Sequence, residues 1–312
     1  MKFAHHLGTA AIAASIGLAT HMAAAEPLNV GMSVGSLGNP FFVATVKGAE
    51  AELKTLDRTA RVTAVSADYD LNKQATEIEN FIAAGDRMVL LNAVDPVAIA
   101  PTIAKAHAAG MIVAAFDVSA KGADVTAQTN NVKAGEIACQ YLADKLGGKG
   151  DIVIINGPQV SAVVDRVNGC KSALARHPAM KILSDNLDAK GSRDGGLAMM
   201  QGLLTRFAHI DGVFAINDPT AIGADLAAKQ LHRDEMIITS VDGAPDIEVA
   251  LKSNTRIVAS ASQDPYMMAA TAARLGYEAL QGRKPAQPVV LLDPQLITRD
   301  NVAQYKGWQA PR

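Results

Sequence analysis

Short apolar runs rich in Val and Ile alternate along the chain with longer segments in which apolar residues recur every three or four positions. The first pattern predicts buried strands and the second predicts amphipathic helices. The candidate strands are Leu28–Ser33, Arg61–Ser66, Arg87–Leu91, Met111–Phe116, Asp151–Ile155, Gly212–Ile216, Met236–Val241 and Thr255–Ala261. The candidate helices include Val43–Leu56, Lys73–Ala84, Ile99–Ala109 and Gly135–Leu146.

Strand and helix alternate with a period of roughly 25–30 residues, which is typical of a parallel sheet with helices on both faces. The candidate strands are apolar almost throughout, as expected when helices cover both sides of a sheet. Four units precede Asn130-Asn131, and a second series begins after the glycine-rich segment 147–150. The pattern therefore predicts an α/β protein of two similar, doubly wound lobes.

Polar residues follow almost every candidate strand. Ligands of open α/β sheets bind beyond the carboxyl ends of the strands, and Asn, Asp and Gln offer donors and acceptors that suit hydroxyl groups. The same residues are also ordinary helix caps, and we expect that role for Asp218 and Asp264, which each precede a proline. The polar residues at the strand ends are Ser33, Ser66, Asp68, Asn92, Asp117, Asn156, Asn217, Asp218, Asp242, Ser262 and Gln263.

The first 25 residues have the anatomy of a secretory signal peptide. A short basic start that includes Lys2 precedes an apolar stretch from Leu7 to Ala19, and three alanines lie just before Glu26. We expect cleavage before Glu26 and export of a soluble product. An uncleaved anchor is the alternative, but the apolar stretch is shorter than the roughly 20 residues that span a bilayer.

Composition narrows the possible partners. The formal net charge is −2 and 19% of the residues are charged, without the basic stripe that a nucleic-acid-binding protein requires. Both cysteines, Cys139 and Cys170, follow the predicted signal peptide. In an oxidising compartment they are expected to form a disulfide, and two buried free thiols are the alternative.

The sequence carries no pattern typical of a catalytic or cofactor site. The histidines beyond the signal peptide lie in or at the ends of helical segments, and none pairs with another at a metal-ligand spacing. Phosphate-binding glycine loops and dinucleotide fingerprints are also absent from the sequence. We therefore expect binding without catalysis, metal or cofactor; an exported carbohydrate hydrolase that uses carboxylates alone is the weaker alternative.

Several segments resemble the ribose-type periplasmic sugar-binding proteins, which are the substrate receptors of bacterial ABC importers. The resemblance runs from about Leu28 to Ile297, with the motifs in family order. Repressors related to the lactose repressor share these lobes but begin with a helix-turn-helix, where this chain has a predicted signal peptide. The matching segments are Asn39-Pro40-Phe41-Phe42, Asn92 in LLNAVD, Asp117 in AAFDVSA, FAINDPTAIGA from Phe214 to Ala224, and SVDGAPD from Ser240 to Asp246.

The resemblance implies a type I periplasmic binding protein fold, in which three crossings join the lobes. The crossings would fall near Asn131, Gln263 and Asp293. The first lobe would comprise residues 26–131 and 264–292, and the second lobe residues 132–263 and 293–312. The sugar would be enclosed between the lobes, and hinge closure would present the closed form to a permease.

The resemblance also assigns roles to single residues. Phe41 and Phe42 would lie against the C–H faces of the sugar; a hydrophobic staple for the following helix is the alternative. Arg166 would contact the ligand from the second lobe, or else be a solvated residue paired with Asp165. The residues implied as hydrogen-bond partners of ligand hydroxyls are Asn39, Asn92, Asp117, Asn217, Asp242 and Gln263.

Three departures from the ribose-binding pattern make ribose a doubtful ligand. Val118 stands where those members have Arg, Lys190-Gly191 where they have an aromatic residue, and Val241 where they have Phe. We expect the wall that faces the two phenylalanines to be smaller or more polar, which favours a sugar alcohol or a differently shaped monosaccharide.

The resulting hypothesis is a monomeric periplasmic protein that delivers a sugar or polyol to an ABC permease. A receptor that signals through a chemoreceptor or sensor kinase is the alternative from a different class, and transport and sensing can coexist.

Overall fold

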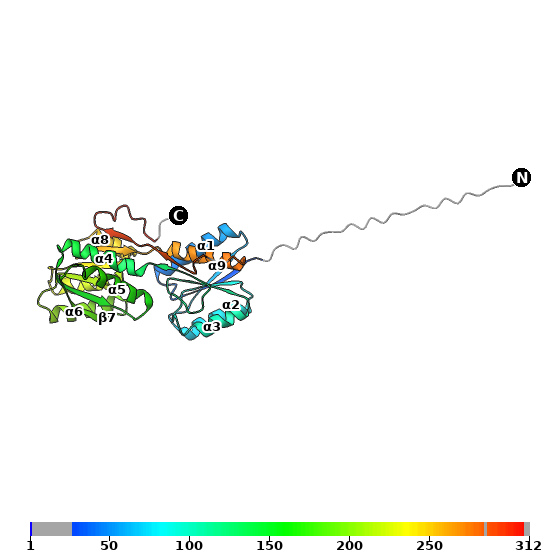
Figure 1. Cartoon of the computed structure of the whole chain (residues 1–312), viewed down its shortest axis with the longest axis horizontal. Helices are drawn as coiled ribbons and strands as arrows, with labels where there is room; N and C mark the ends of the chain where they lie inside the picture. Colours follow the sequence, from blue (N-terminus) through cyan, green and yellow to red (C-terminus); the bar gives the residue numbers. More distant parts are fainter. Residues whose placement is uncertain (2–26, 284–285, 309–312) are drawn as a thin grey trace.

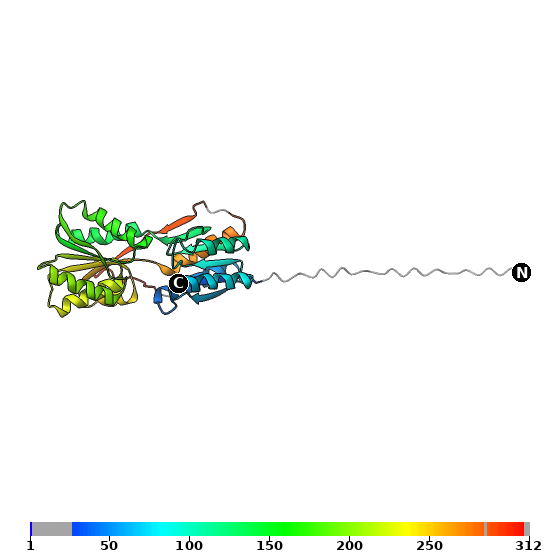
Figure 2. The ribbon, with the colours of Figure 1, turned by 90° about the horizontal axis from the view of Figure 1, so that it is seen from below.

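The computed structural model describes residues 27–283 and 286–308, together with Met1, so the predicted signal peptide lies outside the described residues apart from Met1. Two α/β lobes lie end to end along the long axis of the molecule, and several segments of chain cross between them (Figures 1 and 2). Each lobe contains a six-stranded sheet. The prediction of two doubly wound lobes is therefore confirmed.

The first sheet is parallel throughout, with the order β11-β5-β4-β3-β1-β2. Its core divides into two clusters, one beneath α1 and α9 and one beneath α2 and α3, so helices cover both faces. The strands are β1 (Asn29–Val34), β2 (Arg61–Ser66), β3 (Met88–Leu91), β4 (Ile112–Phe116), β5 (Val125–Thr129) and β11 (Val289–Leu292). The helices are α1 (Pro40–Leu56), α2 (Leu71–Ala83), α3 (Ala100–Ala108) and α9 (Pro265–Leu280).

The second sheet has the order β12-β10-β9-β8-β6-β7, and only β12 runs antiparallel to its neighbour. Helices α4 and α5 cover one face, and α6, α7 and α8 cover the other. The strands are β6 (Lys149–Asn156), β7 (Ala179–Asp188), β8 (Gly212–Ala215), β9 (Ile237–Asp242), β10 (Ile257–Ser262) and β12 (Gln295–Thr298). The helices are α4 (Asn131–Lys145), α5 (Ser161–Leu174), α6 (Arg193–Arg206), α7 (Asp218–Gln230) and α8 (Pro245–Leu251).

Eight strands coincide with the apolar runs of the sequence, whereas β5, β7, β11 and β12 were not predicted. The missed strand β7 lies at a sheet edge, and most of its residues are exposed or half-buried. An edge strand of this kind lacks the continuous apolar run by which buried strands are recognised. Among the described residues, no helix is both long and apolar enough to cross a bilayer.

Hydrogen bonds tie the three crossings to one another. The first crossing leads from β5 to α4, and the backbone amide of Asn130 donates to the carbonyl of Leu292, at the crossing from β11 to β12, at 2.8 Å. The side chain of Asn130 also donates to Asp293 at 3.1 Å. Thr129 donates to the side-chain carbonyl of Gln263, at the crossing from β10 to α9, at 2.9 Å. The three segments thus form one connected hinge region.

Candidate ligand-binding site between the lobes

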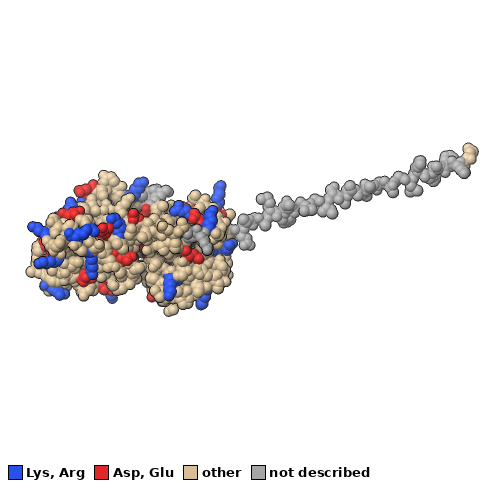
Figure 3. Space-filling model, in the orientation of Figure 1, with Lys and Arg blue, Asp and Glu red and all other residues tan. Residues whose placement is uncertain are grey.

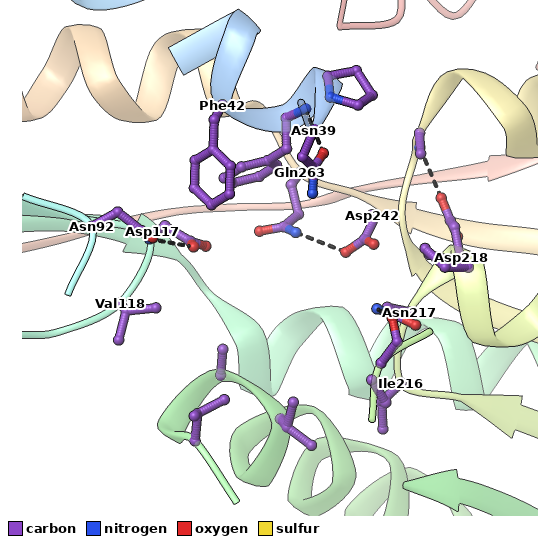
Figure 4. A pocket seen from close by; sticks show the side chains of 18 of the residues that line it. Asn39, Phe42, Asn92, Asp117, Val118, Ile216, Asn217, Asp218, Asp242 and Gln263 are labelled. Atoms are coloured by element: carbon purple, nitrogen blue, oxygen red, sulfur yellow. Dashed lines mark hydrogen bonds between the residues drawn. The ribbon is translucent and has the colours of Figure 1, made fainter. Parts of the chain in front are cut away.

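A cavity of about 850 Å³ lies between the lobes, at the carboxyl ends of both sheets. In Figure 4, Phe42, Asn92 and Asp117 project from one side, Asn217 and Asp242 from the other, and Gln263 lies between them. The residues that the sequence assigned to a ligand site all line this cavity: Asn39, Phe41, Phe42, Asn92, Asp117, Arg166, Asn217, Asp242 and Gln263. Their role in binding a ligand stays a prediction.

The aromatic pair Phe41 and Phe42 lies in the first turn of α1. The side chain of Asn39 caps this helix by accepting a hydrogen bond from the amide of Phe41 at 2.9 Å. A hydrophobic staple uses the residue before the cap, which here is Gly38, so the staple interpretation is wrong. Both rings are more than 90% buried and meet edge to face, with centroids 5.2 Å apart. They therefore belong to the core of the first lobe and also line the cavity.

Asp117 follows β4 with a positive φ of 64°, a conformation that non-glycine residues rarely adopt. The side-chain amide of Asn92, which follows β3, donates to the carboxylate of Asp117 at 2.9 Å. Burial raises the pKa of Asp117 to about 6, an effect that Arg166 on the other lobe partly offsets. The two residues present a fixed amide and a carboxyl group to the cavity.

Arg166 lies on α5 and is 5% exposed. Its guanidinium donates to the carbonyl of Ile216 at 2.9 Å and to the carboxylate of Asp242 at 3.1 Å. It also donates to the side chain of Asn131 at 2.9 Å. The alternative of a solvated arginine paired with Asp165 is therefore wrong, because Arg166 is buried and its ionic partner is Asp242.

Close packing of α4 against α5 fixes the backbone at Arg166. A Cβ atom at Gly135 of α4 would lie 1.9 Å from the carbonyl oxygen of Arg166, so only glycine fits there. A disulfide between Cys139 and Cys170 joins the same two helices, with a Cα–Cα distance of 5.0 Å. Both sulfur atoms belong to the buried core of the second lobe. The free-thiol alternative does not describe this structure.

Asp242 ends β9 and receives two side-chain hydrogen bonds. One comes from Arg166, and the other comes from the amide of Gln263 at 2.8 Å. Burial raises the pKa of Asp242, whereas the adjacent guanidinium lowers it. Because Gln263 also accepts from Thr129, it connects the second-lobe carboxylate to the hinge region.

Asn217, not Asp218, caps α7. The side chain of Asn217 accepts from the amide of Thr220 at 3.1 Å and donates to the carbonyl of Gly191 at 2.9 Å. Asp218 is fully buried and accepts from the hydroxyls of Ser240 and Ser260 at 2.5 and 2.7 Å. Its expected role as a cap was therefore wrong, whereas Asp264 does cap α9. Burial and the nearby Asp242 raise the pKa of Asp218 to about 8.

Comparison with known proteins identifies the family. The periplasmic binding protein domain matches residues 30–284. The ribose import binding protein of Bacillus subtilis is 33% identical over 262 residues, which cover 83% of this chain and 84% of the relative. The chain belongs to the ribose-type family of periplasmic sugar-binding proteins.

Two further members of the family show how its ligands vary. A xylitol-binding protein of Mycolicibacterium smegmatis is 31% identical over 76% of this chain and 68% of its own length. A solute-binding protein of an ABC transporter from Mycobacterium smegmatis, solved with bound glycerol, is 26% identical with a TM-score of 0.80. That match covers 89% of this chain and 96% of the solved chain. The ribose relative is a component of an import system, and the glycerol-bound relative is a component of an ABC transporter.

The departures from the ribose pattern do not all reach the cavity of this binding protein. Val118 and Gly191 line it, but Val241 is fully buried in the second-lobe core and does not. The sequence predicted a wall opposite the phenylalanines that is smaller or more polar than in the ribose-binding members, and this stays a prediction. The second lobe lines the cavity with polar side chains, such as Arg166, Asn217 and Asp242, and also with aliphatic ones. The aliphatic residues are Pro158, Val160, Ala162, Val163, Ile216 and Ile222.

Sequence reasoning missed two aromatic residues of the cavity. Tyr69 follows β2 with a positive φ of 58° and is 61% exposed. Trp308 lies near the end of the chain, is 6% exposed, and meets Phe41 edge to face. No local periodicity marks either residue. The signal that could have found Trp308 was its rarity, because it is the only tryptophan in the chain.

Charged side chains of both signs are interspersed on the face shown in Figure 3, without a dominant field of one sign. Among residues 27–283 and 286–308, no three His, Cys, Asp or Glu side chains are grouped so that they could hold a metal ion.

Proposed function

We propose that this protein captures a monosaccharide or sugar alcohol in the cavity between its lobes and delivers it to the permease of an ABC importer. It would act in the periplasm, as a monomer and without chemical change to the ligand. The observation that carries the proposal is the composition of the cavity. Carboxylates and amides from both lobes converge on a space bordered by an aromatic pair and an aliphatic wall.

The chemistry of the lining suits a molecule with many hydroxyl groups. Asp117 and Asp242 are acceptors for hydroxyl donors, while the amides of Asn92 and Gln263 are already fixed by hydrogen bonds to these carboxylates. Apolar side chains that face one another across the cavity suit the C–H surfaces of the ligand. Because Asp117 is in the first lobe and Asp242 in the second, one ligand that binds both would draw the lobes together.

A polyol is the ligand class that we favour. The guanidinium of the ribose-binding pattern is absent at Val118, and Gly191 leaves the facing wall without an aromatic ring. An open-chain polyol needs less flat stacking and more hydroxyl partners than a sugar ring. The ligand named for the xylitol-binding relative supports this choice.

The test is a screen of purified mature protein against xylitol, myo-inositol, glycerol, ribose and other simple sugars by thermal shift and calorimetry. Solution scattering at saturation should then give a smaller radius of gyration, because the lobes close on the ligand. Chromatography of the recovered sugar should find it unaltered. Absence of binding across the panel, or release of a cleaved product, would overturn the proposal.

A further inference from the structure

The chain crosses between the lobes a fourth time, after β12. Val302 belongs to the core of the second lobe, and Tyr305 packs against that core. The hydroxyl of Tyr305 donates to the carbonyl of Gly243, which follows β9, at 3.0 Å. Three residues later, Trp308 is part of the core of the first lobe. The resemblance to the family implied three crossings, and this short segment is an addition to them.

A tight turn lets the segment leave the second lobe. Gly307 has a φ of 67°, and a Cβ atom there would lie 2.5 Å from a carboxylate oxygen of Glu248 on α8. The positive φ favours glycine at this position, and the end of the Glu248 side chain would have to move to admit any other residue. Gly307 therefore lies against the second lobe, and the next residue, Trp308, packs in the first lobe.

The indole of Trp308 touches two parts of the site. Its ring meets Phe41 with centroids 5.4 Å apart and an interplanar angle of 77°. Its N–H donates to the backbone carbonyl of Gln263, at the hinge, at 3.3 Å. The residue also lines the cavity. A single side chain thus joins the aromatic wall to the hinge, and its neighbours in sequence are fixed to the opposite lobe.

We propose that residues 302–308 form a strap that limits how far the lobes open, and that Trp308 is a positioning residue that holds Phe41 in the ligand site. When the lobes move apart, either the contact of Tyr305 with Gly243 or the contact of Trp308 with Phe41 must give way. The positioning role of Trp308 rests on the proposed function. The mechanical part of the inference, that the strap limits opening of the lobes, does not.

The mechanical part is tested without added sugar, by solution scattering of the wild-type protein and of Trp308→Ala, Trp308→Phe and Tyr305→Phe. We expect a larger radius of gyration for Trp308→Ala and a smaller increase for Trp308→Phe, which keeps a ring against Phe41. Tyr141→Ala is the matched control, since Tyr141 lies on α4 and contacts Lys145 on the same helix. If Trp308→Ala does not fold, the two conservative variants decide the question.

The single tryptophan provides a second readout. In Tyr305→Phe, acrylamide should quench the indole more strongly than in the wild-type protein, because the strap loses its second-lobe anchor. Scattering curves that match the wild-type curve in every strap variant, together with unchanged indole quenching in Tyr305→Phe, would overturn the strap.

Xylitol and ribose are the probes for the positioning role. Whichever of them binds the wild-type protein should bind Trp308→Ala at least about tenfold more weakly, with a smaller loss for Trp308→Phe. Unchanged affinity in Trp308→Ala would refute the positioning role. If neither probe binds the wild-type protein, the tightest-binding member of the panel of simple sugars and polyols replaces them. If no member of that panel binds, the site assignment fails together with the positioning role, while the scattering result still decides the strap.

Discussion

Replacing Arg166 with methionine should lower the free energy of unfolding by about 3–5 kcal/mol. Arg166 and Asp242 form an ion pair in which the side chains are only 7% and 13% exposed. Removing one partner of a buried pair leaves an uncompensated buried charge, and losses of about 3–5 kcal/mol are typical of that change. Methionine has a similar length and suits the apolar surroundings of α5, so the loss of charge dominates the effect.

Lys171→Met is the matched control, because it removes a cation from the same helix. The ammonium of Lys171 lies 2.6 Å from the carboxylate of Asp185, but the two side chains are 43% and 38% exposed. Pairs at this exposure contribute at most about 1 kcal/mol. The variant Arg166→Met with Asp242→Asn should recover much of the lost stability, because the amide leaves no buried charge.

Urea denaturation of the oxidised protein, followed by circular dichroism at pH 7, measures these differences. Equal losses for Arg166→Met and Lys171→Met would show that the Arg166–Asp242 pair is not buried in solution. A double variant no more stable than Arg166→Met would show that the loss came from the contacts to Asn131 and Ile216 rather than from the charge of Asp242.

Four further predictions concern the disulfide, the binding site and the ligand. Thiol titration of unfolded, unreduced protein should detect no free thiol, because Cys139 and Cys170 are bonded; two thiols would contradict this. By calorimetry, Asp117→Ala should weaken binding by about 2–4 kcal/mol, whereas His107→Ala, on α3 and paired with Asp124, should not; equal affinities would mean that the site is misplaced. Affinity should fall between pH 7 and pH 5, since the pKa of Asp117 is raised to about 6 and its protonated form loses an acceptor; Asp117→Asn should show a smaller pH dependence. Ribose should bind at least about tenfold more weakly than the best ligand of the panel, and a panel headed by ribose would refute the polyol preference.

The pattern of apolar and polar positions predicted the architecture because most strands are buried on both faces. Such strands are continuous apolar runs, and the helices between them repeat at three and four residues. Three of the four missed strands, β7, β11 and β12, lie at sheet edges, and at least half of the residues in each are exposed or half-buried. The fourth, β5, is mostly buried, but polar residues interrupt its sequence VTAQT. Their place in the sheets is set by pairing with distant strands, which no local window of sequence contains.

The site was predictable to a different degree at each position. Residues at strand ends, such as Asn92 and Asp242, follow from topology, because the carboxyl ends of parallel strands meet at one edge of a sheet. Val241 showed the limit of carrying a pattern over from a family, since its side chain points into the core beneath α4 and α5. Trp308 reaches the cavity only through the fourth crossing, which no feature of the sequence around it indicates.

The capping role of Asn39 and Asn217 and their predicted ligand-binding role do not exclude each other. Asn39 and Asn217 each cap a helix with the side-chain oxygen while lining the cavity. The cap fixes the rotamer of the side chain, so no further conformational entropy is lost when a ligand hydroxyl meets it. Preorganisation of this kind improves affinity without a new contact. An ordinary N-cap residue has a fixed side chain because it bonds to the helix backbone. Where helix N-termini of two lobes border one cavity, that fixed side chain is also well placed to bind a ligand.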